Sequence, residues 1–241
     1  MTALRLLFEP ITIGTMELKT RVAMAPMATD YAEGDGRISQ RLIDYLTARA
    51  EGGVGLITSE MTTIDEFSPY VPRTVALWDD NFIPGFKKLS EAVHAHGAKL
   101  IPQIAHPGPE SLSPFFHQRE PVGPSPVMCF VTKHVSRELD VDEIETIIEQ
   151  FGEAARRARE AGCDGMELHA AHSYMLLGSF LSPLRNKRAD EYGGDLDGRL
   201  RMPLRVIGRI REMAGEDFPI ILRISGDHII EGGMGVSDTR Y

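Results

Sequence analysis

The sequence predicts an α/β fold, a TIM (β/α)₈ barrel of which these 241 residues hold about the first five βα units. Five short apolar runs alternate with loops and amphipathic helices, which is typical of a parallel sheet built from crossover units. Polar or unusual residues stand at or just after the carboxyl end of each run, where barrel enzymes build their active sites. An open doubly wound sheet also fits the alternation, but no Gly-rich phosphate-binding motif follows the first run. The residues at these strand ends are Pro26-Met27, Glu60, Gln103, His169 and Arg223.

The expected strands are short apolar runs bounded by glycine, proline or polar loops. The first ends at Pro26, because proline has no backbone N–H to donate to a neighbouring strand. In chain order, the sequence predicts strands over residues 21–25, 54–58, 99–104, 165–169 and 219–224.

The expected helices show apolar residues at helical spacing and end at or near glycine or alanine. The clearest one follows Asp140, which forms a capping-box pattern with Glu143 and is expected to run to Ala161. The segment 107–139, rich in proline, serine and phenylalanine, is expected to decorate the barrel as a loop. The other helices are predicted from about residue 39 to just before Gly52-Gly53, over 84–95 and over 200–214.

Composition limits the classes of partner. The formal net charge of −9 argues against nucleic acid and anionic membranes, which both need a basic face. The apolar runs are strand-length, so no membrane span is expected, and the first residues lack a secretory signal. Two cysteines, Cys129 and Cys163, are too few for a disulfide framework. A reduced cytoplasmic protein with a small-molecule substrate is expected, and a homo-oligomer is compatible with these features.

The most informative stretch leaves the fourth expected strand and then turns helical. His169 and His172 lie three residues apart, so both can converge on one acceptor, and Tyr174 can point a phenol at the same cavity. Two donors can polarise a carbonyl, and a phenol can deliver a proton to a developing carbanion. The plainer interpretation is that the histidines are buried rim residues and the tyrosine only packs.

Two other chemistries remain open at this stage. The histidine pair could bind zinc, but no third ligand stands at a suitable spacing, so no metal site is predicted. A glycosidase-like barrel using Glu60 and Glu167 is a further alternative, but it accounts for few of the residues at the strand ends.

The stretch resembles the signature of Old Yellow Enzyme-type flavin reductases. That family pattern is H-x-x-[N/H]-x-Y, then F-L-S-P, then N-x-R-x-D-x-Y-G-G and a later arginine, and it matches residues 169–199 here. The rest of the chain is similar as well, including Met24-Ala-Pro-Met27, Ala105-His-Pro-Gly108 and Leu222-Arg-Ile-Ser225. The resemblance therefore covers essentially the whole chain.

The resemblance implies an FMN at the carboxyl end of the barrel. Backbone around Pro26, Met27 and Ala28 would lie against the flavin ring, as would Met61. It further implies that Gln103 hydrogen-bonds the pyrimidine edge and that Arg223 stabilises the reduced flavin's negative charge. Alternatively, Gln103 only makes a hydrogen bond inside the barrel and Arg223 only pairs with Glu167. Ala28 stands where some single-domain relatives carry a redox-tuning cysteine, so that form of tuning is not expected.

The implied reaction takes electrons from NAD(P)H and passes hydride to the β-carbon of an activated alkene. His169 and His172 would bind the substrate carbonyl, and Tyr174 would protonate the α-carbon. Within the family, the sequence as a whole resembles the 2,4-dienoyl-CoA reductases and 2-enoate reductases. An amine dehydrogenase or demethylase similar to trimethylamine dehydrogenase is the alternative.

The chain ends where a fifth helix should begin, so residues 1–241 are expected to be the N-terminal part of the barrel of a longer protein. The late loops of this fold bind the cofactor phosphate. A [4Fe–4S] cluster and an FAD-binding domain, which the long reductases append to the barrel, would lie further along. The alternative is a truncated, non-catalytic remnant.

Overall fold

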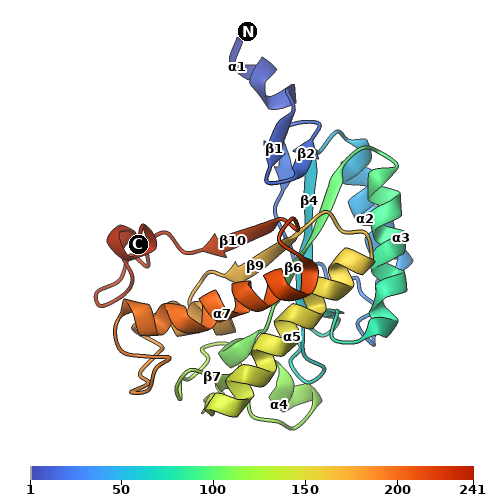
Figure 1. Cartoon of the computed structure of the whole chain (residues 1–241). Coiled ribbons are helices and arrows are strands. Elements are labelled where there is room, and N and C mark those ends of the chain that lie inside the picture. The colour runs from blue at the N-terminus through green and yellow to red at the C-terminus, as the bar shows by residue number, and fades with distance from the viewer. Residues whose placement is uncertain (1) are drawn as a thin grey trace.

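The computed structural model describes residues 2–241; Met1, the first residue of the expected domain, lies outside them. Its centre is a sheet of parallel strands whose spatial order follows the chain (Figure 1). A doubly wound sheet reverses its order near the middle, whereas barrel strands are added in sequence, so this order confirms a partial α/β barrel. In order, the strands are β3 (Ala23–Met24), β4 (Leu56–Thr63), β6 (Lys99–Ala105), β9 (Met166–Ala170) and β10 (Ile220–Ile224), and the short β5 (Val75–Ala76) pairs with β4.

The expected strands are all present, but two differ in length. β3 holds only two of its five expected residues, and β4 continues five residues beyond the expected end at 58. The apolar-run criterion misses this extension because it contains serine, glutamate and threonine. All eight residues of β4 are nevertheless buried, because β4 pairs with β3 and β5 on one edge and with β6 on the other.

The expected long helices are confirmed. Asp140 and Glu143 form the predicted capping box, and the Ser39 side chain caps the first long helix by accepting from the Leu42 amide. The last long helix begins at Leu196 rather than at 200, because Asp195 accepts from the Gly198 amide and starts it earlier. The helices are α2 (Gln40–Glu51), α3 (Ile83–His94), α5 (Val141–Glu160) and α7 (Leu196–Ala214). The short 3-10 turn η2 (Asp80–Phe82) directly precedes α3.

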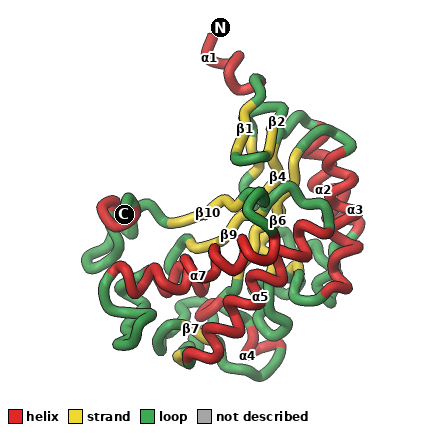
Figure 2. The backbone as a smooth tube through the Cα atoms, in the orientation of Figure 1, coloured by secondary structure: helices red, strands yellow, loops and turns green. Residues whose placement is uncertain are grey.

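The main core lies between the sheet and these helices, which cover the outer face of the curved sheet (Figure 2). Each helix contributes the apolar side chains of one of its faces to this core, as amphipathic spacing requires. Fully buried members are Leu42 of α2, Phe86 and Leu89 of α3, Phe151 of α5 and Val206 of α7.

A short hairpin that the sequence analysis did not predict covers the start of the sheet. It consists of β1 (Ile11–Ile13) and β2 (Met16–Leu18), and it follows α1 (Thr2–Arg5) and η1 (Leu6–Phe8). Met16 and Leu18 bury themselves against Leu56 at the start of β4 and Ile101 in β6. The hairpin therefore closes a second, smaller core on the inner side of the sheet.

The 107–139 segment is a loop excursion as expected, with short elements of its own. These are η3 (Gly108–Glu110), α4 (Ser113–Phe116), β7 (Val122–Gly123) and β8 (Arg137–Glu138), the last two forming a parallel pair. The Arg188 side chain ties the excursion to the barrel by donating to the carbonyl oxygens of Pro124 and Leu139.

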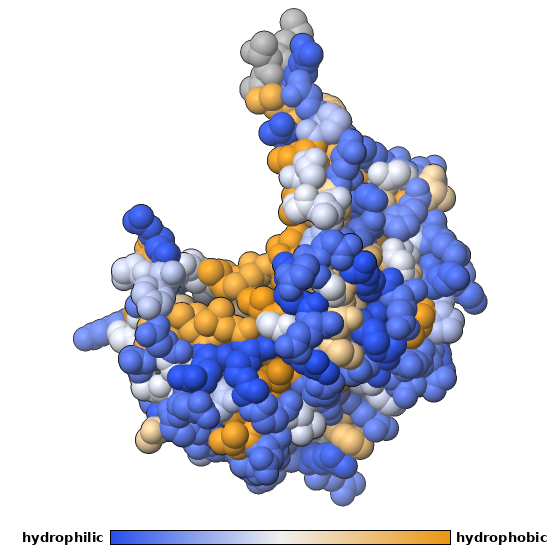
Figure 3. All heavy atoms as spheres, viewed as in Figure 1, coloured by the Kyte–Doolittle hydropathy of each residue, from blue (hydrophilic) through white to orange (hydrophobic). Residues whose placement is uncertain are grey.

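The remaining elements are α6 (Leu176–Leu181), which follows β9, and α8 (Val236–Thr239). Apolar surface is exposed in the hollow between the N-terminal hairpin and the C-terminal end (Figure 3). Leu222 and Ile224 of the edge strand β10 are 42% and 37% exposed. Among the helices described for residues 2–241, none combines the length and apolarity that a membrane crossing requires.

Candidate active site

The parallel register brings two predicted site residues, Met61 and Gln103, to one level with Glu167 of the next strand. Met61 of β4 lies opposite Gln103 of β6, and Gln103 lies opposite Glu167 of β9. Two residues further along β9, His169 lies opposite Arg223 of β10. Residues two apart on a strand share a face, so Glu167 and His169 point to the same side of the sheet.

A tight turn after β9 brings the histidines and the tyrosine together. His172 and Ser173 both have positive φ values, +69° and +57°, which reverses the chain within two residues. The Tyr174 hydroxyl then lies 3.0 Å from Nδ1 of His172, and the two rings stack with centroids 5.2 Å apart. The His169 ring lies 5.4 Å from the His172 ring, almost perpendicular to it. All three residues predicted to be catalytic therefore meet at one place.

His169 is a neutral hydrogen-bond donor. Burial, then the charges of His172 and Arg223, lowers its pKa to about 4. Its Nδ1 accepts a hydrogen bond from the Ala171 amide, so the ring proton of the neutral form lies on Nε2. Burial, then the charge of Arg223, also lowers the pKa of His172. The pair therefore offers N–H groups without bringing positive charge into the site.

Tyr174 keeps its proton at neutral pH. Burial raises the pKa of its phenol to about 12, and the neighbouring Tyr70 and Glu110 act in the same direction. Tyr70 packs with Tyr174 against a buried cluster of Met61, Ala105 and Met175. The sequence analysis missed Tyr70, since it lies in a loop outside any motif that was recognised.

Glu167 links Gln103 and Arg223. The Gln103 amide donates to Glu167 at 2.7 Å, and the Arg223 guanidinium lies 3.9 Å from the same carboxylate. These contacts are the ones expected under the alternative in which Gln103 only makes a hydrogen bond inside the barrel and Arg223 only pairs with Glu167. Burial raises the pKa of Glu167, and the Gln103 hydrogen bond and Arg223 oppose that shift.

The same residues fit a flavin. Within residues 2–241, the Arg223 side chain donates no hydrogen bond, so its N–H groups are free to hold a negative charge. Met27 and Ala28, just after β3, are exposed, and Met27 shows 63% of its surface. Pro26 is half-buried, whereas Met61 is buried within its own cluster. The exposed residues after β3 and the Arg223 guanidinium on β10 stand on strands at opposite edges of the sheet, and they offer a flat, electron-accepting ring a surface to lie on and a positive charge.

Glu60 has a structural task that strand position alone did not reveal. Its carboxylate accepts from both the backbone N–H and the hydroxyl of Thr29, at 2.6 and 2.5 Å. This contact holds the segment after β3 against β4. The other carboxylate oxygen is buried and has no partner in the described part of the chain, and burial raises the pKa of Glu60.

The signature segment after α6 builds the scaffold of the site. Asn186 donates to the carbonyl oxygens of Phe180 and Tyr192, both at 2.8 Å. Arg199 donates to the carbonyl oxygen of Leu181, and Arg188 pairs with Asp190. The buried side chains of Asn186 and Arg199 bind backbone carbonyls at both ends of this segment, including those of Phe180 and Leu181 in α6, so the motif ties α6 to the segment that follows it.

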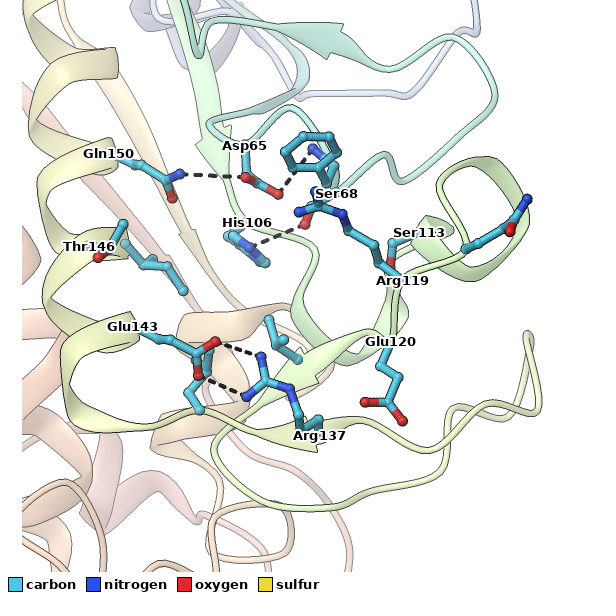
Figure 4. Close-up of a pocket in the computed structure, with 15 residues that line it drawn as sticks. Asp65, Ser68, His106, Ser113, Arg119, Glu120, Arg137, Glu143, Thr146 and Gln150 are labelled. Carbon is cyan, nitrogen blue, oxygen red and sulfur yellow. Dashed lines mark hydrogen bonds and ion pairs between the residues drawn. The ribbon is translucent and has the colours of Figure 1, made fainter.

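A separate polar cavity of about 650 Å³ lies between α5 and the 107–139 segment (Figure 4). None of the predicted site residues lines it. Its Arg137 pairs with Glu143, and Gln150 is directed at Asp65. His106, from the Ala-His-Pro-Gly motif, accepts from the Gly108 amide on its inner wall, and burial lowers its pKa. His106 therefore shapes a loop outside the site of His169 and His172.

Residues 6–241 match the model of the NADH:flavin oxidoreductase / NADH oxidase family. The chain is 47% identical to an NADH oxidase of Thermoanaerobacter brockii, covering 94% of this chain and 35% of that protein. It superimposes on a 2-naphthoyl-CoA reductase complex with a TM-score of 0.92 and 30% identity, over 97% of this chain and 37% of that one. It also superimposes on histamine dehydrogenase from Rhizobium sp. 4-9, with a TM-score of 0.88 and 32% identity, over 98% of this chain and 34% of that one.

The chain spans about a third of the length of these relatives. The match nevertheless extends over nearly all of the chain, and it includes both the sheet and the turn that carries His172 and Tyr174. The chain therefore belongs to the NADH:flavin oxidoreductase / NADH oxidase family, the family of Old Yellow Enzyme-type reductases that its motifs predict.

Proposed function

We propose that the protein containing this chain is an FMN-dependent NAD(P)H oxidoreductase that reduces an activated C=C bond of the enoyl-CoA, dienoyl-CoA or 2-enoate type. The observation that carries the proposal is the meeting of two neutral histidines and a protonated tyrosine after β9. The similarity to a 2-naphthoyl-CoA reductase supports the substrate class.

The residues that would hold FMN are Pro26, Met27, Ala28, Met61, Gln103 and Arg223. When bound, FMN supplies the hydride that it has taken from NAD(P)H. Arg223 offers a fixed positive charge on β10, and Gln103 offers an amide beside it on the inner face of the sheet.

His169 and His172 bind the carbonyl oxygen of the substrate through N–H groups. As hydride reaches the β-carbon, negative charge moves onto that oxygen, and both hydrogen bonds strengthen. Because His169 is neutral and buried, it needs no rearrangement of solvent to serve this charge. Its position is set by β9 and by the hydrogen bond from the Ala171 amide.

Tyr174 delivers the proton. Its O–H bond breaks as a C–H bond forms at the substrate α-carbon, so the enolate becomes the saturated product, and the negative charge passes to the phenolate, which takes a proton back from solvent. A phenol with a pKa of about 12 is fully protonated at neutral pH and is ready for each turnover. Its hydrogen bond with His172 places the proton donor beside the group that binds the carbonyl.

A second candidate is an amine dehydrogenase, which the likeness to histamine dehydrogenase favours. In that case the same three side chains line a pocket for an amine, and electrons flow from the substrate to the flavin. The remaining alternative, a non-catalytic remnant, takes up no flavin.

One set of assays on the full native protein separates these functions. We expect bound flavin, and oxidation of NAD(P)H that depends on an enoyl-CoA or an enoate such as cinnamate. Reduction of the flavin by a methylated amine, with no alkene reduced, would support the second candidate instead. A colourless protein that stays colourless after FMN is added would support the remnant.

We also propose that residues 1–241 form the N-terminal part of the FMN barrel in a longer protein, with a [4Fe–4S] cluster and FAD bound further along the chain. Relatives about three times as long support this arrangement. Measurement of iron, sulfide and FAD in the native protein tests it.

A further inference from the structure

The turn that carries His172 and Tyr174 needs support from outside itself. His172 and Ser173 are consecutive residues in the left-handed region, with φ values of +69° and +57°. Side chains other than glycine rarely adopt this region, so surrounding contacts must hold it. Packing alone does not hold His172, because this residue is exposed.

On one side, α6 presses against the turn. A Cβ atom at Gly178 would lie 2.8 Å from the carbonyl oxygen of Ala171 and 2.9 Å from that of Ala170. The Ser179 hydroxyl donates to the carbonyl oxygen of Ser173 at 3.0 Å. The helix therefore fixes the backbone before and after the reversal.

On the other side, two residues after β10 reach the turn. The Ser225 hydroxyl accepts a hydrogen bond from the His172 amide at 2.8 Å. Nε2 of His228 lies 2.8 Å from the Ser173 hydroxyl, across 55 residues of sequence. These two contacts link the turn to the strand that carries Arg223.

The direction of the His228 hydrogen bond follows from its other nitrogen. Nδ1 accepts from the Met234 amide at 3.0 Å, so a neutral ring carries its proton on Nε2 and donates it to Ser173. Burial lowers the pKa of His228, which favours this neutral form over the opposing effect of Asp227 and Asp238.

We propose that His228 is a positioning residue: acting through Ser173, it holds the left-handed turn so that His172 and Tyr174 face the substrate. We call the His228–Ser173 hydrogen bond the clamp. What the turn binds rests on the proposed function, whereas the clamp itself does not depend on that function. His228 lies outside the motifs that identify the family in this chain, so it adds a residue to the site that the resemblance does not assign.

Two substitutions separate the two nitrogens of His228. In His228→Gln, the terminal amide nitrogen reaches the place of Nε2 and can still donate to Ser173. In His228→Asn, the shorter side chain reaches only the place of Nδ1, so it keeps the Met234 contact and loses Ser173. Ser173→Ala removes the same hydrogen bond from the other end and leaves the loop after β10 unchanged.

The first readout is hydrogen exchange in the full native protein, followed by mass spectrometry on peptides spanning residues 170–176. We expect faster exchange there in His228→Asn and Ser173→Ala, no further increase in the double variant, and wild-type exchange in His228→Gln. Unchanged exchange in both single variants would overturn the proposal. Should His228→Asn fail to fold, Ser173→Ala and His228→Gln still decide the question.

The second readout is binding of 3-phenylpropanoate, which offers an acceptor oxygen but no reducible bond. We expect about tenfold weaker binding in His228→Asn and Ser173→Ala, the size of one lost hydrogen bond, with recovery in His228→Gln. Altered exchange together with unaltered binding in these variants would refute positioning toward substrate. If His228→Asn and Ser173→Ala alter both exchange and binding but the native protein reduces no alkene, the role of His228 is supported and the proposed reaction is refuted.

Discussion

The hydroxyl of Tyr174 lies 3.0 Å from Nδ1 of His172, with the two rings stacked 5.2 Å apart. The two side chains therefore form one unit at the end of β9, in which the residue proposed to bind the carbonyl and the residue proposed to supply the proton are in direct contact. The separate contributions of this unit can be tested one side chain at a time.

Tyr174→Phe removes the proposed proton donor and keeps the ring. We expect reduction of the alkene to slow by about 10²–10⁴-fold, the usual contribution of a positioned general acid. Flavin content and flavin reduction by NAD(P)H should stay near wild type, because neither needs the phenol. Stopped-flow absorbance resolves the two half-reactions. The control is Tyr45→Phe on α2, whose rates should match wild type; an equal loss in both half-reactions would argue against the assigned role.

His169 should make stability depend on pH. Its pKa is about 4 in the folded protein and 6.5 in the absence of perturbation, so the unfolded chain takes up a proton first as pH falls. The stabilising contribution is complete above pH 6.5 and is lost between pH 6.5 and 4, by roughly 3 kcal/mol in all. His169→Gln, which does not titrate, lacks this term. Urea unfolding of both proteins at several pH values measures the difference, which should shrink toward acid pH; a constant difference contradicts the prediction.

Gly178 and Gly208 should respond in opposite directions to alanine. At Gly178 the added Cβ meets two carbonyl oxygens below 3.0 Å, so Gly178→Ala should destabilise the protein by about 1–3 kcal/mol. Gly208 lies inside α7 with nothing within 4 Å of the new atom, so Gly208→Ala should stabilise by up to about 1 kcal/mol. Thermal unfolding of both variants provides the comparison, and destabilisation by Gly208→Ala would show that helix propensity does not dominate there.

Cys163 should be unreactive in the folded protein. Burial raises the pKa of its thiol, with Asp164 adding to the shift, so little thiolate forms at neutral pH. The side chain is only 6% exposed. Iodoacetamide should therefore label Cys163 only after unfolding in urea, as mass spectrometry of the modified peptide can establish. Rapid labelling of the native protein would mean that the end of α5 opens readily.

Much of the molecule could be predicted from local pattern. The capping box at Asp140 and Glu143 marks the start of α5, and the periodic apolar residues after it mark its buried face. These signals are local, since caps and helix faces depend on residues three or four apart. The end of β4 could not be predicted in this way, because its serine, glutamate and threonines are buried by strands from elsewhere in the chain.

The sequence by itself determined the alternation of strands and helices, the family, and the presence of His169, His172 and Tyr174 in one short stretch. Only the tertiary structure decided that the strands follow one another in a singly wound sheet and that Glu60 holds Thr29. It also decided which nitrogen of His169 carries the proton, and it placed His228 against Ser173. The reason is physical: hydrogen-bond direction, burial and pKa depend on neighbours that folding brings from tens of residues away, and no local pattern encodes those neighbours.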